Sequence, residues 1–294
     1  MKNTTKSYAL AFIAASILFS SSAFASNEET TTADDLKSKL PSKVRDKIIE
    51  HTTESCTDPL EDVSAEAAFN WYCKHLKNGE IPPCPSEMNF ISECAGVYLG
   101  DPKEKVIYLT FDAGYENGNI EKILNVMKEK EVTGAFFVLE NIVQKNADLI
   151  RRMSDEGHLI CNHTAKHKDM TSVTDKSKFK AELDTLNEAC ASIGVECAPF
   201  YRPPEGRFSR KNLEIVKDLG YTTVFWSFAY ADWDNNSQPS PEKAKQKILD
   251  GTHNGMVLLL HPTSATNAAI LGDLIDMWKS EGYRFGSIAE LANK

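Results

Sequence analysis

Short apolar runs alternate with amphipathic segments from residue 105 onward, and this alternation limits the fold more than any other feature of the sequence. The apolar runs predict strands at 105–111, 134–138, 158–162, 198–201, 221–226, 256–260 and 283–285. Apolar residues at helical spacing predict helices near 119–130, 140–156, 175–193, 209–219, 240–250 and 265–281. Such alternation predicts an α/β fold with a parallel sheet, as either an open doubly wound sheet or a closed barrel.

Glycines mark the ends of several of these helices. Gly157, Gly194, Gly220 and Gly282 each come just after a predicted helix. The residue after a helix often takes a left-handed conformation, which glycine adopts without a steric penalty. The predicted boundaries therefore agree with the apolar pattern.

The first 25 residues have the pattern of a secretory signal peptide. Lys2 and Lys6 precede an apolar segment, and Ala23-Phe24-Ala25 supplies small residues at the −3 and −1 positions of a cleavage site. An uncleaved anchor is the alternative, because the apolar segment is long enough to remain in a membrane. We predict a secreted, extracytoplasmic protein with no stable membrane span after cleavage.

Composition divides the rest of the chain into a linker, an N-terminal extension and a main domain. Residues 26–40 are polar and acidic and predict a flexible linker. Residues 41–100 predict an N-terminal extension packed on the main domain, 101–294, with Trp71 and Tyr72 as aromatic anchors. The net charge of −9 argues against a nucleic-acid partner.

Export permits disulfides among the seven cysteines. Cys190 and Cys197 flank a predicted helix-to-strand turn and can bridge. The four cysteines before residue 100 can form two further bridges. Cys161 then remains unpaired in a buried strand, where packing is its expected role and a nucleophile the alternative. No CxxC pair is present, which argues against a structural zinc site.

Asp112 lies at the carboxyl end of the first predicted strand of the main domain, in Thr110-Phe111-Asp112-Ala113-Gly114. In βα folds the loops that follow the strands form one face, where catalytic groups collect. An aspartate there can act as a general base, a metal ligand or a helix cap.

Two histidines follow a later strand, in Asn162-His163-Thr164-Ala165-Lys166-His167. Four-residue spacing allows both imidazoles to reach one metal ion. By themselves they can equally be surface histidines.

Further candidate residues follow three other strands. They are Arg202 before Pro203-Pro204-Glu205-Gly206, the pair Asp232-Trp233, and His261 after Leu259-Leu260. Each also has an ordinary structural interpretation. Arg202 can form a plain salt bridge, Trp233 can belong to the core, and His261 can be a buried histidine with its hydrogen bonds satisfied.

In this order, the segments resemble the five motifs of the NodB-type polysaccharide deacetylases over roughly residues 105–292. The closest resemblance is to the branch that deacetylates muramic acid in spore-cortex (muramic δ-lactam) formation. It is carried by Tyr98-Leu99-Gly100, residues 108–118, residues 258–267 and Gly282-Tyr283-Arg284-Phe285. The resemblance implies an irregular (β/α)7 barrel and hydrolysis of N-acetyl groups.

The resemblance also implies a role for each candidate residue. Asp112 would be the general base and Arg202 its ion-pair partner. His261 would protonate the departing amine, with Asp232 holding its imidazole. The remaining roles are divalent-metal ligands, zinc in the first place, for His163 and His167, and substrate binding, including an oxyanion donor at its backbone N–H, for Glu205.

One position departs from the family pattern. The usual motif has a second aspartate as a metal ligand, whereas this chain has Ala113, which has no donor atom. The predicted ligand set is therefore two histidines plus water or substrate, unless Glu116 or Asn117 contributes. Such a set holds a metal less firmly. The muramic-acid branch also tolerates this loss.

The predicted substrate is peptidoglycan or another N-acetylated glycan, with N-acetylmuramic acid favoured and cell-wall association implied. A carboxylate of muramic acid is predicted to meet Arg207, Lys166 or Lys168. Trp233 or Tyr201 is predicted to stack on the sugar, with Leu259 also in the substrate site. The alternatives are an N-acetylglucosamine deacetylase and a non-catalytic glycan-binding module.

Overall fold

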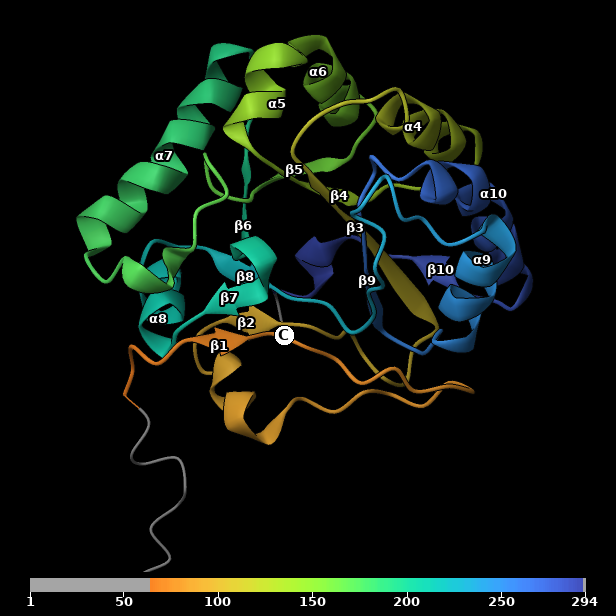
Figure 1. Ribbon diagram of the computed structural model, residues 1–294, viewed down its shortest axis with the longest axis horizontal. Coiled ribbons are helices and arrows are strands. Elements are labelled where there is room, and N and C mark those ends of the chain that lie inside the picture. Colours follow the sequence, from red (N-terminus) through yellow and green to blue (C-terminus); the bar gives the residue numbers. More distant parts are fainter. Residues whose placement is uncertain (1–63, 293–294) are drawn as a thin grey trace, which may run out of the picture. The chain divides into compact units, whose positions relative to one another are not determined.

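The computed structural model describes residues 64–292, and its centre is a curled sheet of parallel strands (Figure 1). Parallel pairing runs from β9 through β3, β4, β5 and β6 to β8, and β10 pairs with the start of β3. The strands are β3 (Val106–Ala113), β4 (Ala135–Val138), β5 (Leu159–Asn162), β6 (Ala198–Tyr201), β8 (Thr222–Val224), β9 (Met256–Leu260) and β10 (Arg284–Phe285). All seven predicted strands are therefore confirmed.

The seam between β8 and β9 makes the fold an irregular barrel rather than an open sheet. Just after β8, Phe228 forms a parallel bridge with Leu258 of β9. At the other end of the seam, β2 (Gly96–Val97) pairs with β8, and Leu99 bridges antiparallel to Met256. The (β/α)7 prediction is thus confirmed, with a short strand and isolated bridges in place of a regular last pairing.

Helices cover the outside of the sheet (Figure 1). They are α4 (Ile120–Glu129), α5 (Glu140–Lys145), α6 (Ala147–Asp155), α7 (Lys176–Ser192), α8 (Arg210–Asp218), α9 (Pro241–Asp250) and α10 (Ala265–Ser280). The four glycines predicted at helix ends all have positive φ, from 78° to 87°.

The helix predicted at 140–156 is interrupted, which corrects that prediction. Asn146 leaves the helical conformation, with φ −133° and ψ 45°. Its N–H donates to Ile142 O, and its carbonyl accepts from Leu149 and Ile150. One residue therefore ends α5 and begins α6.

Alternation along β3 sets the direction of the candidate base. Ile107, Leu109, Phe111 and Ala113 pack in the cluster shared with the outer helices. The residues between them face the barrel interior, because successive side chains of a strand point to opposite faces. Asp112 is the last of these inward residues.

Residues 64–100 pack on the barrel. In this stretch β1 (Phe69–Asn70) pairs antiparallel with β7 (Arg207–Phe208), and η1 (Ser86–Ile91) is a short 3-10 helix. Trp71 is buried, stacks on Phe225 at 4.7 Å and donates its indole N–H to Trp226 O. Tyr72 is 47% exposed, so only Trp71 is an anchor.

The predicted signal peptide, the linker and the start of the extension lie outside the described residues. Within residues 64–292, no helix is both long and apolar enough to cross a membrane.

No disulfide joins the six cysteines within residues 64–292. Cys190 and Cys197 lie in hydrogen-bonding contact with each other. Cys161 is fully buried, and burial raises the pKa of its thiol. A thiol that resists ionisation is a poor nucleophile, so packing is the role that this environment favours.

Candidate active site

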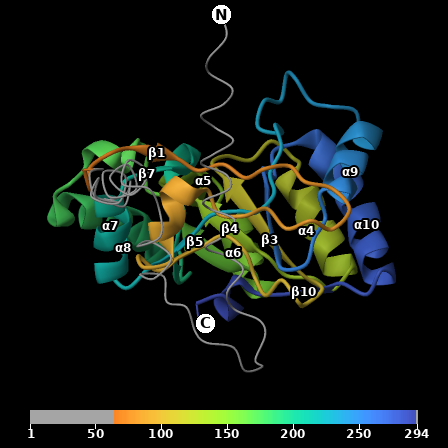
Figure 2. The same cartoon turned by 90° about the horizontal axis from the view of Figure 1, so that it is seen from below.

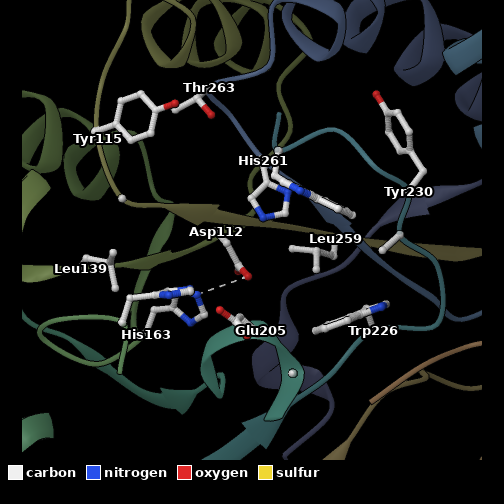
Figure 3. A pocket seen from close by; sticks show the side chains of 15 residues that line it. Asp112, Tyr115, Leu139, His163, Glu205, Trp226, Tyr230, Leu259, His261 and Thr263 are labelled. Atoms are coloured by element: carbon white, nitrogen blue, oxygen red, sulfur yellow. Dashed lines mark ion pairs between the residues drawn. The ribbon is translucent and has the colours of Figure 1, made fainter. Parts of the chain in front are cut away.

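A cavity of about 700 Å³ opens at the carboxyl ends of the strands (Figure 3). The side chain of Asp112 points into it between His163 on one side and His261 on the other. The predicted site residues that line the cavity are Asp112, His163, His167, Glu205, Trp233, Leu259 and His261. Two others, Arg202 and Asp232, lie directly behind them and contact Asp112 and His261 respectively.

Asp112 is held as a carboxylate. Its Oδ1 accepts from Arg202 Nη1 at 2.8 Å, and its side chain is 10% exposed. Burial by itself raises the pKa of Asp112, but electrostatic interactions, first with the guanidinium of Arg202 and then with the His163 and His261 rings, outweigh it, so that the pKa lies below its usual value. The group is therefore ionised at neutral pH.

Arg202 is fully buried and its contacts fix it in place. Besides Asp112, it donates to Thr110 Oγ1 at 2.9 Å and to the carbonyl oxygens of Val224 and Phe225. Its guanidinium also lies 4.1 Å from the centre of the Phe137 ring. A buried cation needs such a complete set of partners, because an unpaired charge in the interior is costly.

His163 presents an unprotonated nitrogen to the cavity. Its Nδ1 lies 2.9 Å from the carbonyl oxygen of Arg202, and a carbonyl only accepts, so Nδ1 carries the hydrogen. Nε2 then bears the lone pair and lies 3.6 Å from Asp112 Oδ2. Burial, aided by His167, lowers the pKa of His163 to about 4, which keeps the ring neutral.

The two histidines lie together as the spacing predicts. Their ring centres are 5.0 Å apart, and the rings meet edge to face. Neutral imidazoles with a free nitrogen are ordinary ligands of divalent cations. Among residues 64–292, however, no group of three or more His, Cys, Asp or Glu side chains is arranged to hold a metal ion. The donor chemistry suits a metal, whereas the number of protein ligands stops at two.

The residues considered as a third ligand lie outside the cavity lining, and Ala113 is buried on the outer face of β3. One Glu116 oxygen accepts from the backbone N–H of Gly118 just before α4, while the other, Oε2, is buried without a hydrogen-bond partner. Asn117 donates to Thr263 O at 2.9 Å. Neither Glu116 nor Asn117 lines the cavity.

His261 is oriented by a buried carboxylate. Its Nδ1 lies 2.7 Å from Asp232 Oδ1, and its backbone N–H donates to Asp232 Oδ2 at 2.8 Å. Burial alone lowers the pKa of His261, but the hydrogen bond and charge of Asp232, with the charge of Asp112, raise it above the usual value. The imidazole can therefore carry a proton toward the cavity at neutral pH.

The loop after β6 supplies the wall opposite His261. Glu205 lines the cavity in a left-handed conformation, with φ 57°, inside η3 (Pro204–Gly206). Gly206 follows with φ 67°, and a Cβ at this position would lie 2.8 Å from the Trp226 ring. The backbone of this loop therefore lies directly against the Trp226 ring, which also lines the cavity.

The sequence matches known proteins over this same region. The family model described as "Polysaccharide deacetylase" matches residues 99–224. Peptidoglycan-N-acetylmuramic acid deacetylase PdaA of Bacillus subtilis is 44% identical over 225 residues, which are 76% of this chain and 85% of that protein. The chain belongs to the polysaccharide deacetylase family.

Solved structures agree with that membership. The structure of Bacillus subtilis PdaA, a family 4 carbohydrate esterase, is similar with a TM-score of 0.74 and 42% identity, covering 78% of this chain and 98% of that one. A mutant with restored activity of a pseudoenzyme from this esterase family, from Bacillus anthracis, has a TM-score of 0.62 and 26% identity, covering 67% and 71%.

One predicted substrate contact is wrong, and the predicted cationic contacts do not line the cavity. Tyr201 is 1% exposed and packs edge-on against Phe179 of α7, so it cannot stack on a sugar. Arg207 pairs with Asp169 at 3.1 Å and does not line the cavity. Lys166 and Lys168 are also absent from the lining.

Sequence reasoning missed a second layer of polar residues. Asn267 of α10 is fully buried and donates to Asp232 Oδ2 at 2.6 Å and to His261 O at 3.1 Å. Its Oδ1 accepts from the hydroxyl of Tyr230, which lines the cavity. Asn267 stands at helical spacing from the apolar Ile270, Leu271 and Leu274, and a polar residue on that face is the signal that could have revealed it.

Proposed function

We propose that this polysaccharide deacetylase removes acetyl groups from N-acetylmuramic acid in peptidoglycan. The observation that carries the proposal is the placement of an ionised Asp112 and a protonatable His261 in one cavity. Amide hydrolysis needs a base for the attacking water and an acid for the departing nitrogen. The activity named for the Bacillus subtilis relative supports the choice of sugar.

The chain's own residues account for the proton transfers. Asp112 accepts a proton from the water as its oxygen bonds to the acetyl carbon. The backbone N–H of Glu205 donates to the oxyanion that forms. His261 then gives its proton to the amine nitrogen as the carbon–nitrogen bond breaks, because an unprotonated amine is a poor leaving group. The products are acetate and the free amino sugar.

We infer that His163 and His167 hold a divalent cation, zinc by the preference of neutral imidazole. Enzymes of this family are metal-dependent. Such an ion would polarise the acetyl carbonyl and lower the pKa of the attacking water. With only two protein ligands, we expect the ion to be lost more readily than from a three-ligand site.

We place the activity outside the cytoplasm, at the cell wall, in the formation of muramic δ-lactam during sporulation. The predicted signal peptide at 1–25 and the peptidoglycan-acting relative support this placement. An N-acetylglucosamine deacetylase is the alternative enzyme. A non-catalytic glycan-binding module is the alternative of another class, and a similar chain from Bacillus anthracis is described as a pseudoenzyme of this esterase family.

Acetate release from purified peptidoglycan strands tests the proposal. We expect Asp112→Asn to lower the rate by about 10³-fold, the size of a lost general base. Glu121→Gln, which removes an exposed carboxylate from the first turn of α4, is the control and should leave the rate unchanged. Circular dichroism checks that Asp112→Asn still folds with Arg202 unpaired.

The outcome also separates the alternatives. Mass spectrometry of the digested strands identifies which sugar lost its acetyl group. Loss from N-acetylglucosamine alone would favour the second enzyme. Binding of strands without any acetate release, with metal supplied, would favour the binding module. Full activity of Asp112→Asn would remove Asp112 from the role of base.

A further inference from the structure

A second cavity, of about 450 Å³, is lined in part by the same segment as the first. The two share one stretch of chain, since Phe228 lines the second while Ala229 and Tyr230 line the first. The residues that follow β1 run toward α9 at this place (Figure 2), and Lys77 Nζ lies 2.8 Å from Asp250 Oδ2 at the end of that helix. A polymer that leaves the first cavity along this segment would reach the second.

The floor of the second cavity is aromatic. The His75 ring stacks on Phe228, with centres 4.9 Å apart and planes 20° from parallel. Burial, with Lys247 nearby, lowers the pKa of His75, so this ring is neutral. Flat faces of this kind suit contact with a sugar ring.

The rim of the second cavity is cationic. Lys77, Lys243 and Lys247 line it, against the single carboxylate of Asp250. Lys77 and Gln246 already bond to that carboxylate. Lys243 and Lys247 form no ion pair with any residue in 64–292. The Asp250 carboxylate is therefore already occupied, and the ammonium groups of Lys243 and Lys247 have no counter-charge.

The placement of Lys243 and Lys247 costs the unliganded protein some stability. Lys243 and Lys247 are four residues apart on α9 and therefore share a face, where like charges repel. The first cavity, in contrast, has no lysine or arginine in its lining. Of the two cavities, only the second offers lysine side chains to a negatively charged substrate.

We propose that the second cavity binds a carboxylate of the glycan strand whose sugar occupies the first. This inference rests on the proposed function, because muramic acid is the sugar that carries a carboxylate. Lys243 and Lys247 contact the carboxylate, and the exposed ring of His75, which stacks on the buried Phe228, contacts the sugar beside it. The carboxylate belongs either to the lactyl group of a neighbouring muramic acid or to a peptide stem, which present the same chemistry.

Binding of purified glycan strands to Lys243→Gln/Lys247→Gln tests this proposal. Three probes are needed: strands without stems, the same strands with their carboxylates converted to methylamides, and strands with intact stems. We expect the variant to bind strands without stems about fivefold more weakly than the wild type, as two partly exposed ion pairs predict. The methylamide strands should bind both proteins alike. High salt should remove the difference.

The control is Lys103→Gln/Lys178→Gln, which removes the same charge from exposed lysines that line neither cavity and form no ion pair in residues 64–292. It should bind every probe as the wild type does. An effect of Lys243→Gln/Lys247→Gln on strands with stems but not on strands without them would assign the carboxylate to the stem.

Equal binding of charged and methylamide strands by the wild type would overturn the proposal, as would a variant that binds like the control. Failure of the wild type to bind any strand would also overturn it. Because the readout is binding, the two proposals can fail separately. A wild type that releases no acetate but shows the charge-dependent difference loses only the proposed function.

Discussion

Arg202 connects the parts of the candidate active site at the scale of a single residue. Its guanidinium holds Asp112 and reaches the carbonyls of two residues near the end of β8, while its own carbonyl fixes the tautomer of His163. One buried side chain thus keeps the base ionised, and the same residue directs an imidazole lone pair into the cavity. The other side of the site depends in the same way on Asp232, which accepts three hydrogen bonds.

The raised pKa of His261 predicts the pH dependence. An acid must be protonated, so kcat/KM should fall as pH rises through the pKa of His261. Asp232→Asn removes the charge that raises this pKa, and we expect the alkaline fall to move down by about one unit or more. The maximal rate should also drop by about 10²-fold. A pH profile of kcat/KM, with Asp234→Asn as the control in the same loop, measures both.

If the fall of kcat/KM at high pH stayed at the same pH in Asp232→Asn, this assignment of the acid would be contradicted.

The Asp232–His261 pair also affects the stability of the fold. A histidine whose pKa is raised in the folded state stabilises it fully below the unfolded value of about 6.5, and the contribution is lost as pH rises through the folded pKa.

Site residues were predictable from the sequence where the chemistry requires a particular side chain at a strand end. Tyr201 was assigned wrongly, although the alternation of side chains along its strand already argued against that assignment. It precedes Arg202 directly, and neighbours along an extended chain point to opposite faces. With Arg202 facing Asp112, Tyr201 had to face α7. The partner of Arg207 was not predictable, because Asp169 comes from a distant loop.

At the scale of elements, the turn between α7 and β6 combines a helix end with a thiol pair. Cys190 lies in the last turns of α7, and Cys197 directly precedes β6. The two thiols are in contact, so the disulfide that the sequence suggested can form with little movement of the chain. The short elements around it were harder to foresee. Strands of two residues such as β1, β2 and β7 show no periodicity, and their pairing depends on partners far along the chain.

We predict a Cys190–Cys197 disulfide in protein purified from an oxidising compartment. Closing a loop of this length should stabilise the fold by about 2–3 kcal/mol. Peptide mapping by mass spectrometry without reductant should find the cross-linked peptide, and urea denaturation should show the loss in Cys197→Ser. In Cys84→Ser, the control, the cross-linked peptide should remain. Recovery of both thiols free from non-reduced protein would exclude the bridge.

At the scale of the whole described region, residues 64–100 and the barrel share a hydrophobic core. Trp71, Met88, Ile91 and Cys94 pack in one cluster with Phe225. A segment that contributes to a shared core cannot unfold by itself without exposing its neighbours. The sequence predicted that the extension packs on the barrel, but not that β2 occupies the seam.

Trp71→Ala should therefore lower the free energy of unfolding by about 3–4 kcal/mol, as for other large-to-small changes in a core. Urea denaturation should retain a single transition, because the two parts unfold together. Tyr72→Ala is the matched control, since its ring is 47% exposed, and should cost less than about 1 kcal/mol. Equal effects of the two changes, or a separate early transition, would show that the stretch is not part of the cooperative unit.

The seam between β8 and β9 has a consequence for the order of folding. Gly100 donates to Gly255 O at 2.7 Å, and Leu99 bridges to Met256, so the seam joins segments from opposite ends of the described chain. Contacts between such distant segments form slowly, because a long loop must be closed first. A nascent intermediate can bring Asp112 and Arg202 together before β9 docks, but it has no His261 in place. During refolding, enzymatic turnover should thus reappear only with the slowest kinetic phase, after most of the helical signal has returned.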